Sequence, residues 1–234
     1  MAKSQRTDLG RRADALLDAA AGLLLADGSR RIRIEEVAAR AGVGKGTVYL
    51  HWPSRDHLLL AVGAREAAAM LDLVAAAVEA DPVEAAPHRY LRRHFLEAVR
   101  RPVLRLIFGA EAGELDALAR HPARERVAEA KLVAGREYLS ALDRHRLLRP
   151  GQDLADVEYG MEAVAYGFFA AEPFRPGADP DYRADRLAEV VRRAFEPSRA
   201  PSPDRYREAA PQVVAAFTRL AVQFRHTAYG TAAD

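Results

Sequence analysis

The sequence predicts an all-α protein, with a small N-terminal domain of three helices followed by a larger C-terminal helical bundle. Three observations predict this class. Apolar residues recur at helical offsets along most of the 234 residues. No segment of useful length alternates apolar and polar residues with the period of a strand, so no β-sheet is expected. Glycine and proline fall between the periodic stretches, where they end helices.

The composition is that of a globular chain, and it excludes several classes of site. Hydrophobic residues make up 50% of the sequence and charged residues 29%. The lack of cysteine excludes disulfides, thiolate zinc sites and cysteine nucleophiles. No apolar run approaches the roughly 20 residues of a membrane span, and the basic N-terminus lacks the apolar segment of a secretory signal. We therefore expect a cytoplasmic protein.

The first helix is expected to follow a flexible arm formed by residues 1 to about 8. Gly28 ends the apolar stripe of this helix, since glycine stops helices readily. The stripe consists of Leu16, Leu17, Ala20, Leu23 and Leu24. We expect it to pack against the segment that comes next.

That next segment has the pattern of two short helices and a tight turn. Residues 34–41 place apolar side chains at offsets of three, four and seven, and Gly42 then permits a left-handed turn. A second helix from about Lys45 ends at Trp52, because Pro53 pushes the preceding residue out of the helical region. Two short helices joined by such a turn form a helix-turn-helix, whose second helix enters the DNA major groove.

The side chains of this motif divide into an inner and an outer set. Ala38 and Gly42 are expected to let the two helices approach closely, while Val43 and Val48 fill the small core. The outer set combines a cation and hydrogen-bonding groups suited to phosphate oxygens with glycines that let the backbone approach DNA. It consists of Gly44, Lys45, Gly46, Thr47, Tyr49 and His51. Ser54 then caps a third helix, in which Arg55 supplies a further cation.

The stretch AGVGKGTVYLHWPSRDHLL resembles the signature of TetR-family transcriptional regulators. The resemblance is specific over about residues 10–62 and only architectural beyond them. It implies a DNA-binding site at Arg33, Gly44, Lys45, Gly46, Thr47, Tyr49, His51 and Arg55. The family usually places Ser or Thr at the helix caps where this chain has Arg33 and Gly44. Arg33 is expected to reach a phosphate instead.

The same residues allow two alternatives to a DNA-binding motif. The letters GVGKGT share only part of the pattern of a phosphate-binding loop, because Walker A requires a glycine at residue 39 and an upstream strand. A helix-turn-helix used only for packing is the other alternative, but the cation and hydroxyl groups gathered on one helix disfavour it. Residues 1–60 also carry an excess of Lys and Arg, whereas the rest of the chain is slightly acidic.

The C-terminal part is expected to be helical throughout. A helix from Ser54 to about residue 80 ends at Asp81-Pro82 and is shared by both parts of the chain. The predicted domains are residues 1–60, 61–196 and a C-terminal extension, 197–234. The candidate helices in the second domain are 87–100, 103–108, 123–147, 153–170 and 183–195.

Helices 153–170 and 183–195 are predicted to form a homodimer interface. The first has an apolar stripe beside small residues that permit close helix approach, and the TetR resemblance implies dimerisation through the same two helices. The residues concerned are Val157, Gly160, Met161, Ala163, Val164, Gly167, Phe168, Leu187, Val190, Val191 and Ala194. The alternative is that these stripes are buried within one chain. In the extension, a helix with Pro211 in its first turn is expected to pack on the bundle or to extend the dimer.

No motif specifies a reaction, so the chain is expected to be neither an enzyme nor a cofactor-binding protein. The seven histidines lack metal-ligand spacing, since His88 and His94, for example, lie on different faces of a helix. The resemblance implies instead a small-molecule effector held in the bundle. Its predicted contacts are His94, Phe95, Phe108, Tyr138, Met161, Tyr166 and Phe169.

These observations predict a ligand-responsive repressor that binds a palindromic double-stranded DNA operator as a homodimer and is released by its effector. An α-helical enzyme or small-molecule carrier with a vestigial DNA-binding domain remains an alternative. A nonspecific DNA-packaging protein is a further alternative, which the acidic C-terminal part disfavours.

Overall fold

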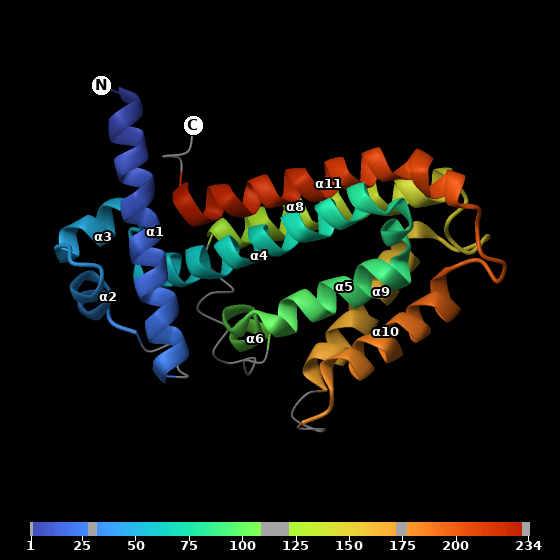
Figure 1. Ribbon diagram of the computed structural model, residues 1–234, viewed down its shortest axis with the longest axis horizontal. Coiled ribbons are helices and arrows are strands. Elements are labelled where there is room, and N and C mark those ends of the chain that lie inside the picture. The colour runs from blue at the N-terminus through green and yellow to red at the C-terminus, as the bar shows by residue number, and fades with distance from the viewer. Residues whose placement is uncertain (1, 28–31, 109–121, 172–176, 231–234) are drawn as a thin grey trace. The chain divides into compact units, whose positions relative to one another are not determined.

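The computed structural model describes residues 2–27, 32–108, 122–171 and 177–230 (Figure 1). Within these ranges the chain is helical and contains no β-strand, which confirms the predicted all-α class. The elements are α1 (Ala2–Asp27), α2 (Ile34–Arg40), α3 (Lys45–His51), α4 (Arg55–Ala80), the 3-10 helix η1 (Pro82–Ala85), α5 (Pro87–Arg100), α6 (Pro102–Phe108), α8 (Pro122–Arg144), α9 (Leu154–Ala170), α10 (Pro180–Phe195) and α11 (Pro203–Tyr229).

The helices form two compact units that do not follow chain order. Unit 1 consists of residues 1–68, 102–128 and 222–234, and unit 2 of residues 69–101 and 129–221. Three helices, α4, α8 and α11, therefore contribute residues to both units.

Unit 1 contains the predicted three-helix domain. Leu16 and Leu17 of α1, Val37 of α2 and Val48 of α3 are fully buried in one apolar core, together with Trp52 just after α3. Removing this much apolar surface from water is the main force that holds such short helices in place.

The last turns of α11 complete unit 1. The Trp52 indole Nε1 donates a hydrogen bond to the carbonyl oxygen of Ala228 at 2.9 Å, and both residues are fully buried. The next residue, Tyr229, packs against the same core, and its hydroxyl donates to Asp14 Oδ1 at 2.8 Å. Gly230 then ends the helix at φ +68°, which glycine adopts without strain.

Two predicted helix starts are wrong. The expected arm at residues 1–8 is helical from Ala2 onward, so α1 begins well before the predicted start. Likewise α11 starts at Pro203, and Pro211 lies inside the helix. A proline there removes one backbone hydrogen bond. The helix continues because its buried face extends on both sides of Pro211, through Tyr206 before it and Phe217 after it.

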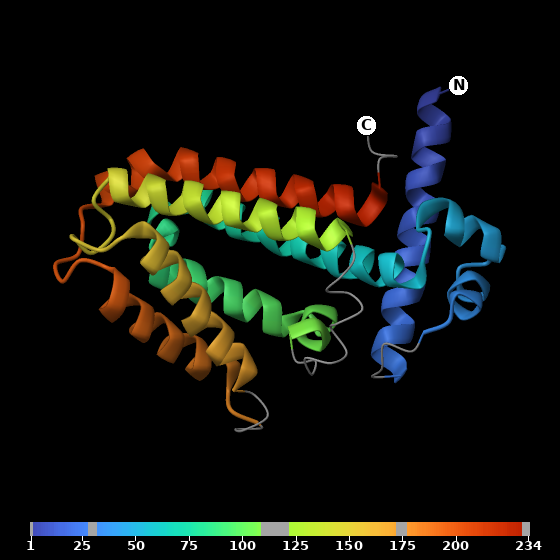
Figure 2. The same ribbon diagram turned by 180° about the vertical axis from the view of Figure 1, so that it is seen from behind.

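In unit 2, α5 packs along α10, and α9 lies against both (Figure 1). Both views also show α8 and α11 running side by side (Figure 2). Two polar contacts join α8 to α11 here. Arg144 Nη1 donates to Gln212 Oε1 at 2.6 Å, and Arg219 Nη2 to Glu137 Oε2 at 2.6 Å.

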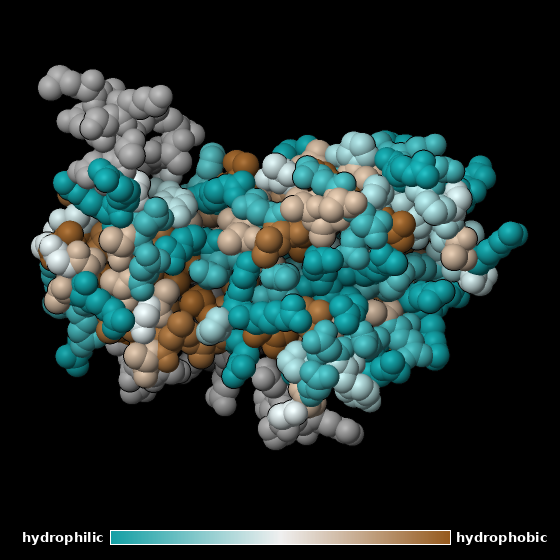
Figure 3. All heavy atoms as spheres, in the orientation of Figure 1, coloured by the Kyte–Doolittle hydropathy of each residue, from teal (hydrophilic) through white to brown (hydrophobic). Residues whose placement is uncertain are grey.

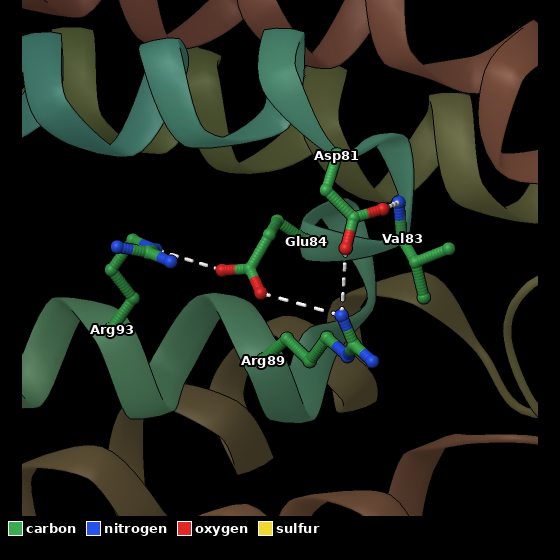
Figure 4. Close-up of polar contacts among 5 residues, drawn as sticks. All are labelled: Asp81, Val83, Glu84, Arg89 and Arg93. Atoms are coloured by element: carbon green, nitrogen blue, oxygen red, sulfur yellow. Dashed lines mark hydrogen bonds and ion pairs between the residues drawn. The ribbon is translucent and has the colours of Figure 1, made fainter.

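The connection from α4 to α5 is held by a network of ion pairs (Figure 4). Asp81 accepts a hydrogen bond from the backbone N–H of Val83 at 3.0 Å and another from Arg89 Nη1 at 3.0 Å. Glu84 bridges two arginines of α5, at 3.4 Å from Arg89 Nη1 and 2.7 Å from Arg93 Nε. The network caps η1 and fixes where α5 begins.

The visible surface over α5 and α10 is mainly hydrophilic (Figure 3). It carries pairs of opposite charge, such as Arg92 Nε with Asp185 Oδ1 at 2.7 Å. In the described part of the chain, no helix is long and apolar enough to cross a membrane. Nor do His, Asp and Glu side chains there gather into a group that could hold a metal ion.

Candidate nucleic-acid interface

Backbone geometry sets the position of α3 at both of its ends. Gly42 has φ +68°, the left-handed turn expected between α2 and α3. Gly44 is the extended N-cap of α3, and its carbonyl accepts a hydrogen bond from the backbone N–H of Thr47 at 2.9 Å. Trp52 leaves the helix with φ −132° and ψ 113°, as the following proline requires. The predicted turn and stop of the recognition helix are therefore confirmed.

The start of α4 and the role of Gly42 give one confirmation and one correction. Ser54 Oγ accepts a hydrogen bond from the backbone N–H of His57 at 3.1 Å, so the predicted cap is present. The expected close approach of helices at Gly42 is wrong, because a Cβ there would meet nothing within 4 Å. Glycine is needed at this position for its positive φ alone.

The two faces of α3 differ sharply. Val48 is fully buried and anchors the helix to the core. On the opposite face Tyr49 is 42% exposed and Leu50 is 86% exposed, and Lys45 is also exposed. Thr47 and His51 lie between these faces and are half-buried.

Lys45 is the cation at the start of α3, and it already has an acidic partner. Its ammonium group contacts the carboxylate of Glu35 on α2 and lies 5.8 Å from the centroid of the Tyr49 ring. The hydrogen bond with Glu35 raises the pKa of Lys45, and the same bond lowers the pKa of Glu35. Lys45 is therefore charged at neutral pH, and a DNA phosphate that binds it must displace Glu35.

His51 closes α3 as a neutral group. Burial lowers its pKa below the ordinary value of 6.5, and the positive charge of Arg12 lowers it further. The imidazole is thus uncharged at pH 7, and it can contact DNA as a hydrogen-bonding group but not as a cation.

Two further arginines predicted to contact DNA have different surroundings. Arg33 is the exposed N-cap of α2, and its backbone N–H donates to Glu36 Oε2 at 3.4 Å. Arg55 is used inside the domain, since Nε donates to the Ile32 carbonyl at 2.8 Å and Nη1 lies 3.3 Å from Asp56 Oδ1. Its first role is therefore to attach the start of α4 to the segment before α2.

Leu50 is a candidate contact that the sequence reasoning missed. An aliphatic side chain this exposed on a short helix cannot contribute to the core, and apolar groups contact the thymine methyl in the major groove. The signal was available in the sequence, because Leu50 follows Tyr49 on a helix whose inner position is already filled by Val48.

A substitution at Gly46 is expected to change the stability of the domain and its affinity for DNA in opposite directions. A Cβ at this position would meet nothing within 4 Å, so Gly46→Ala fits the free protein. Because alanine favours a helix over glycine by up to about 1 kcal/mol, the melting temperature should rise. Operator affinity should fall, because the added methyl group keeps the backbone away from DNA. Calorimetry and DNA titration on the same preparation test this, and an unchanged affinity would place Gly46 outside the interface.

The predicted effector contacts lie in unit 2 and do not all come together. Phe95, Tyr138 and Met161 are buried, and His94 and Phe169 are half-buried. Tyr166 departs from the prediction, because its side chain is 71% exposed on the outer face of α9. The Phe108 side chain lies outside the described residues.

Tyr90 is the member of this region that the sequence reasoning missed. It lies on α5 one turn before His94, and its ring contacts Tyr138 at 5.1 Å and Phe217 at 4.9 Å between centroids. The spacing of four residues between Tyr90 and His94 was the available signal.

The residues predicted at the dimer interface also divide into two groups. Val157 and Met161 of α9, and Leu187 and Val191 of α10, are buried within the single chain, which is the alternative given above for these stripes. Gly160 lies under the Phe195 ring, where a Cβ would come within 2.8 Å. The outer faces of these helices instead expose Ala155, Tyr159, Ala163, Tyr166 and Gly167 on α9, and Tyr182, Arg186, Val190 and Arg193 on α10.

Comparison with known proteins gives a family for the N-terminal domain. Residues 16–62 match the family model described as "Bacterial regulatory proteins, tetR family". This match covers α2, α3 and the residues that flank them. A search of the curated proteins found no match.

Solved structures share the fold over about four-fifths of the chain. NalD, the secondary repressor of the MexAB-OprM multidrug efflux pump in Pseudomonas aeruginosa, has 21% identity and a TM-score of 0.55, covering 81% of this chain and 98% of its own. SmeT, the repressor of the Stenotrophomonas maltophilia efflux pump SmeDEF, has 20% identity and a TM-score of 0.56, with coverage of 82% and 96%. The fatty acid degradation regulator FadR from Bacillus halodurans has 16% identity and a TM-score of 0.59, with coverage of 77% and 94%.

The match to the family model falls on the segment whose turn, caps and exposed recognition helix are described above, and the structural neighbours extend the shared fold over both units. Residues 16–62, which form the helix-turn-helix domain, thus match the TetR family of bacterial regulatory proteins.

Proposed function

We propose that this protein is a transcriptional repressor that binds a palindromic operator as a homodimer and is released by a small-molecule effector. The observation that carries the proposal is α3 itself. Val48 and Trp52 hold the helix from within, while Lys45, Tyr49 and Leu50 stand on the outer face. A cation, a hydroxyl and an apolar group on one exposed helix supply both phosphate and base contacts.

A dimer follows from the small size of one recognition helix, which reads only a few base pairs. Two copies related by a two-fold axis read half-sites about 34–36 Å apart, one turn of DNA, or a multiple of this spacing. We place the interface on the outer faces of α9 and α10, where Tyr159, Tyr166 and Tyr182 are exposed. Exposed tyrosines beside small residues are typical of a surface that a partner covers.

Release by an effector requires an element that differs between two states of the protein. The continuous helix α4 supports this role, because it contributes to both units. An effector bound in unit 2 would shift α4 and change the separation of the two recognition helices. NalD and SmeT, which share the fold, are each described as the repressor of a multidrug efflux pump.

The test compares Lys45→Ala with Glu35→Gln. A duplex selected by the full chain from a randomised pool serves as the operator, and affinity is measured at several salt concentrations. Lys45→Ala should weaken binding and reduce the slope of log affinity against log salt by about one. Glu35→Gln should strengthen binding, because it removes the carboxylate that competes with phosphate for Lys45.

Tyr49→Phe is the matched variant for the hydroxyl, and it should weaken binding without changing dimerisation. If the selection yields no preferred sequence, and binding shows only a salt-sensitive background, the vestigial-domain alternative is correct. If both Lys45→Ala and Glu35→Gln bind like the wild type, α3 does not contact phosphate through Lys45.

A further inference from the structure

The interior of unit 2 contains aromatic side chains that pack ring to ring across three helices. Tyr90 and His94 of α5 have ring centroids 5.7 Å apart. His94 meets Phe169 of α9 edge to face at 6.4 Å, and Tyr90 stacks on Phe217 of α11 at 4.9 Å. We call Tyr90, His94 and Phe169 the aromatic site. All three are only half-buried, so their rings keep apolar surface that a ligand can cover.

The aromatic site holds one buried polar atom that lacks a partner. His94 Nδ1 is buried and has no hydrogen-bond partner. The hydroxyl of the neighbouring Tyr138 donates to the Ala85 carbonyl at 3.0 Å, whereas the Tyr90 hydroxyl forms no hydrogen bond with the described residues and is not one of the buried atoms left without a partner. An unpartnered polar group in the interior costs free energy. A ligand that supplies the missing hydrogen bond at His94 Nδ1 would recover that free energy on binding.

Both polar groups are uncharged at neutral pH. Burial lowers the pKa of His94 to about 4, and the charge of Lys131 acts in the same direction. Burial also raises the pKa of Tyr90 to about 12, with a further contribution from Glu162. The charges that act on His94 and Tyr90, those of Lys131 and Glu162 respectively, thus have opposite signs.

The guanidinium of Arg183, which lies over the neighbouring Phe95 ring, is already engaged. Arg183 Nη2 donates to the Phe168 carbonyl at 2.6 Å, and the guanidinium lies over the Phe95 ring at 5.2 Å. An anionic ligand would therefore lose its hydration without gaining an unengaged cation from Arg183, and the Glu162 charge would oppose the attraction of Lys131. A neutral ligand does not have this cost.

We propose that the effector is a neutral aromatic molecule bearing a hydroxyl group, which lies against Phe169 and places its hydroxyl at His94 Nδ1 and the Tyr90 hydroxyl. A hydroxyl suits either tautomer of His94, because it donates to a bare ring nitrogen and accepts from a protonated one. The word effector rests on the proposed function, whereas binding depends on the aromatic site alone.

The protein is titrated with 2-naphthol, naphthalene and 2-naphthoate, and calorimetry measures the affinity for each probe. These probes share one ring system and differ in carrying a neutral hydroxyl, no polar group or an anion. We expect 2-naphthol to bind about tenfold more tightly than naphthalene, the effect of one net hydrogen bond. We expect 2-naphthoate to bind more weakly than 2-naphthol.

Variants then assign the preference to the aromatic site. His94→Phe keeps a ring and removes the nitrogen, so naphthalene should still bind while the advantage of 2-naphthol is lost. Tyr90→Phe should reduce the same advantage in part. The exposed His226→Phe is the matched control, and it should leave the preference unchanged.

Operator titration of the same samples separates the two proposals. If DNA binding is intact and none of the probes binds, or 2-naphthoate binds best, or His94→Phe keeps the full preference, the inference about the effector is overturned. If the probes bind as expected but no DNA sequence is preferred, the aromatic site stands and the proposed regulatory function fails. If bound 2-naphthol also weakens operator binding, the ligand of the aromatic site is the effector.

Discussion

Replacing two tyrosines on the outer face of α9, Tyr159→Glu together with Tyr166→Glu, is expected to make the protein monomeric and to lower operator affinity by about 10²–10⁴-fold. The two rings are 76% and 71% exposed and lie seven residues apart, so they occupy one stripe of the helix. In a two-fold interface each glutamate would be brought close to its copy in a dry surface, which is strongly unfavourable. The DNA contacts would be untouched, and the loss would come only from uncoupling the two half-sites.

Sedimentation measures the oligomeric state, and DNA titration of the same samples measures affinity. Leu73→Glu is the matched control, because it adds the same charge at an exposed apolar position of α4 in unit 2. It should leave both measurements unchanged. A double variant that remains dimeric would show that the interface lies elsewhere.

Helix ends were predictable wherever one residue type restricts the backbone. Gly42 fixes a positive φ, Pro53 ends α3 at Trp52, and Asp81 with Pro82 ends α4. These helix ends depend on local backbone geometry, which is determined by neighbouring residues in the sequence. The predicted range 87–100 matches α5 for the same reason, since prolines stand at its first residue and just beyond its end.

Which face of a helix is buried was less predictable from the sequence. Helix α9 has apolar or small residues around most of its circumference, so periodicity alone could not separate its inner stripe, with Val157 and Met161, from its outer stripe, with Tyr159 and Tyr166. The predicted dimer stripe contains members of the inner one. Similarly, the sequence identifies Arg55 as a cation but does not show that its guanidinium is bonded to the Ile32 carbonyl.

The completion of unit 1 by α11 could not be predicted at all. The hydrogen bond from Trp52 to Ala228 joins residues 176 positions apart, and no local pattern relates them. The amphipathic pattern of the extension required only that its apolar face be covered, and several surfaces could have covered it.

The second large effect is expected from shortening the chain after Ala221, which removes the turns of α11 that belong to unit 1. Trp52 would lose both the Ala228 carbonyl that its indole N–H binds and the side chains that cover it. Trp52→Ala removes the same packing from within and should cost about 3–5 kcal/mol of unfolding free energy. Because Trp52 directly follows α3, either change should also weaken operator binding.

Trp52 is the only tryptophan in the sequence, so its fluorescence reports on this contact directly. The shortened chain should show red-shifted emission, a lower melting temperature for unit 1 and weaker operator binding, while it remains dimeric through unit 2. Tyr229→Phe is the control, since it removes only the hydrogen bond to the exposed Asp14 and keeps the ring, and it should have little effect. Unchanged emission after truncation would mean that Trp52 is covered without α11. If the shortened chain instead binds DNA as a well-folded dimer but with red-shifted emission, α11 covers the indole and is not needed to hold α3.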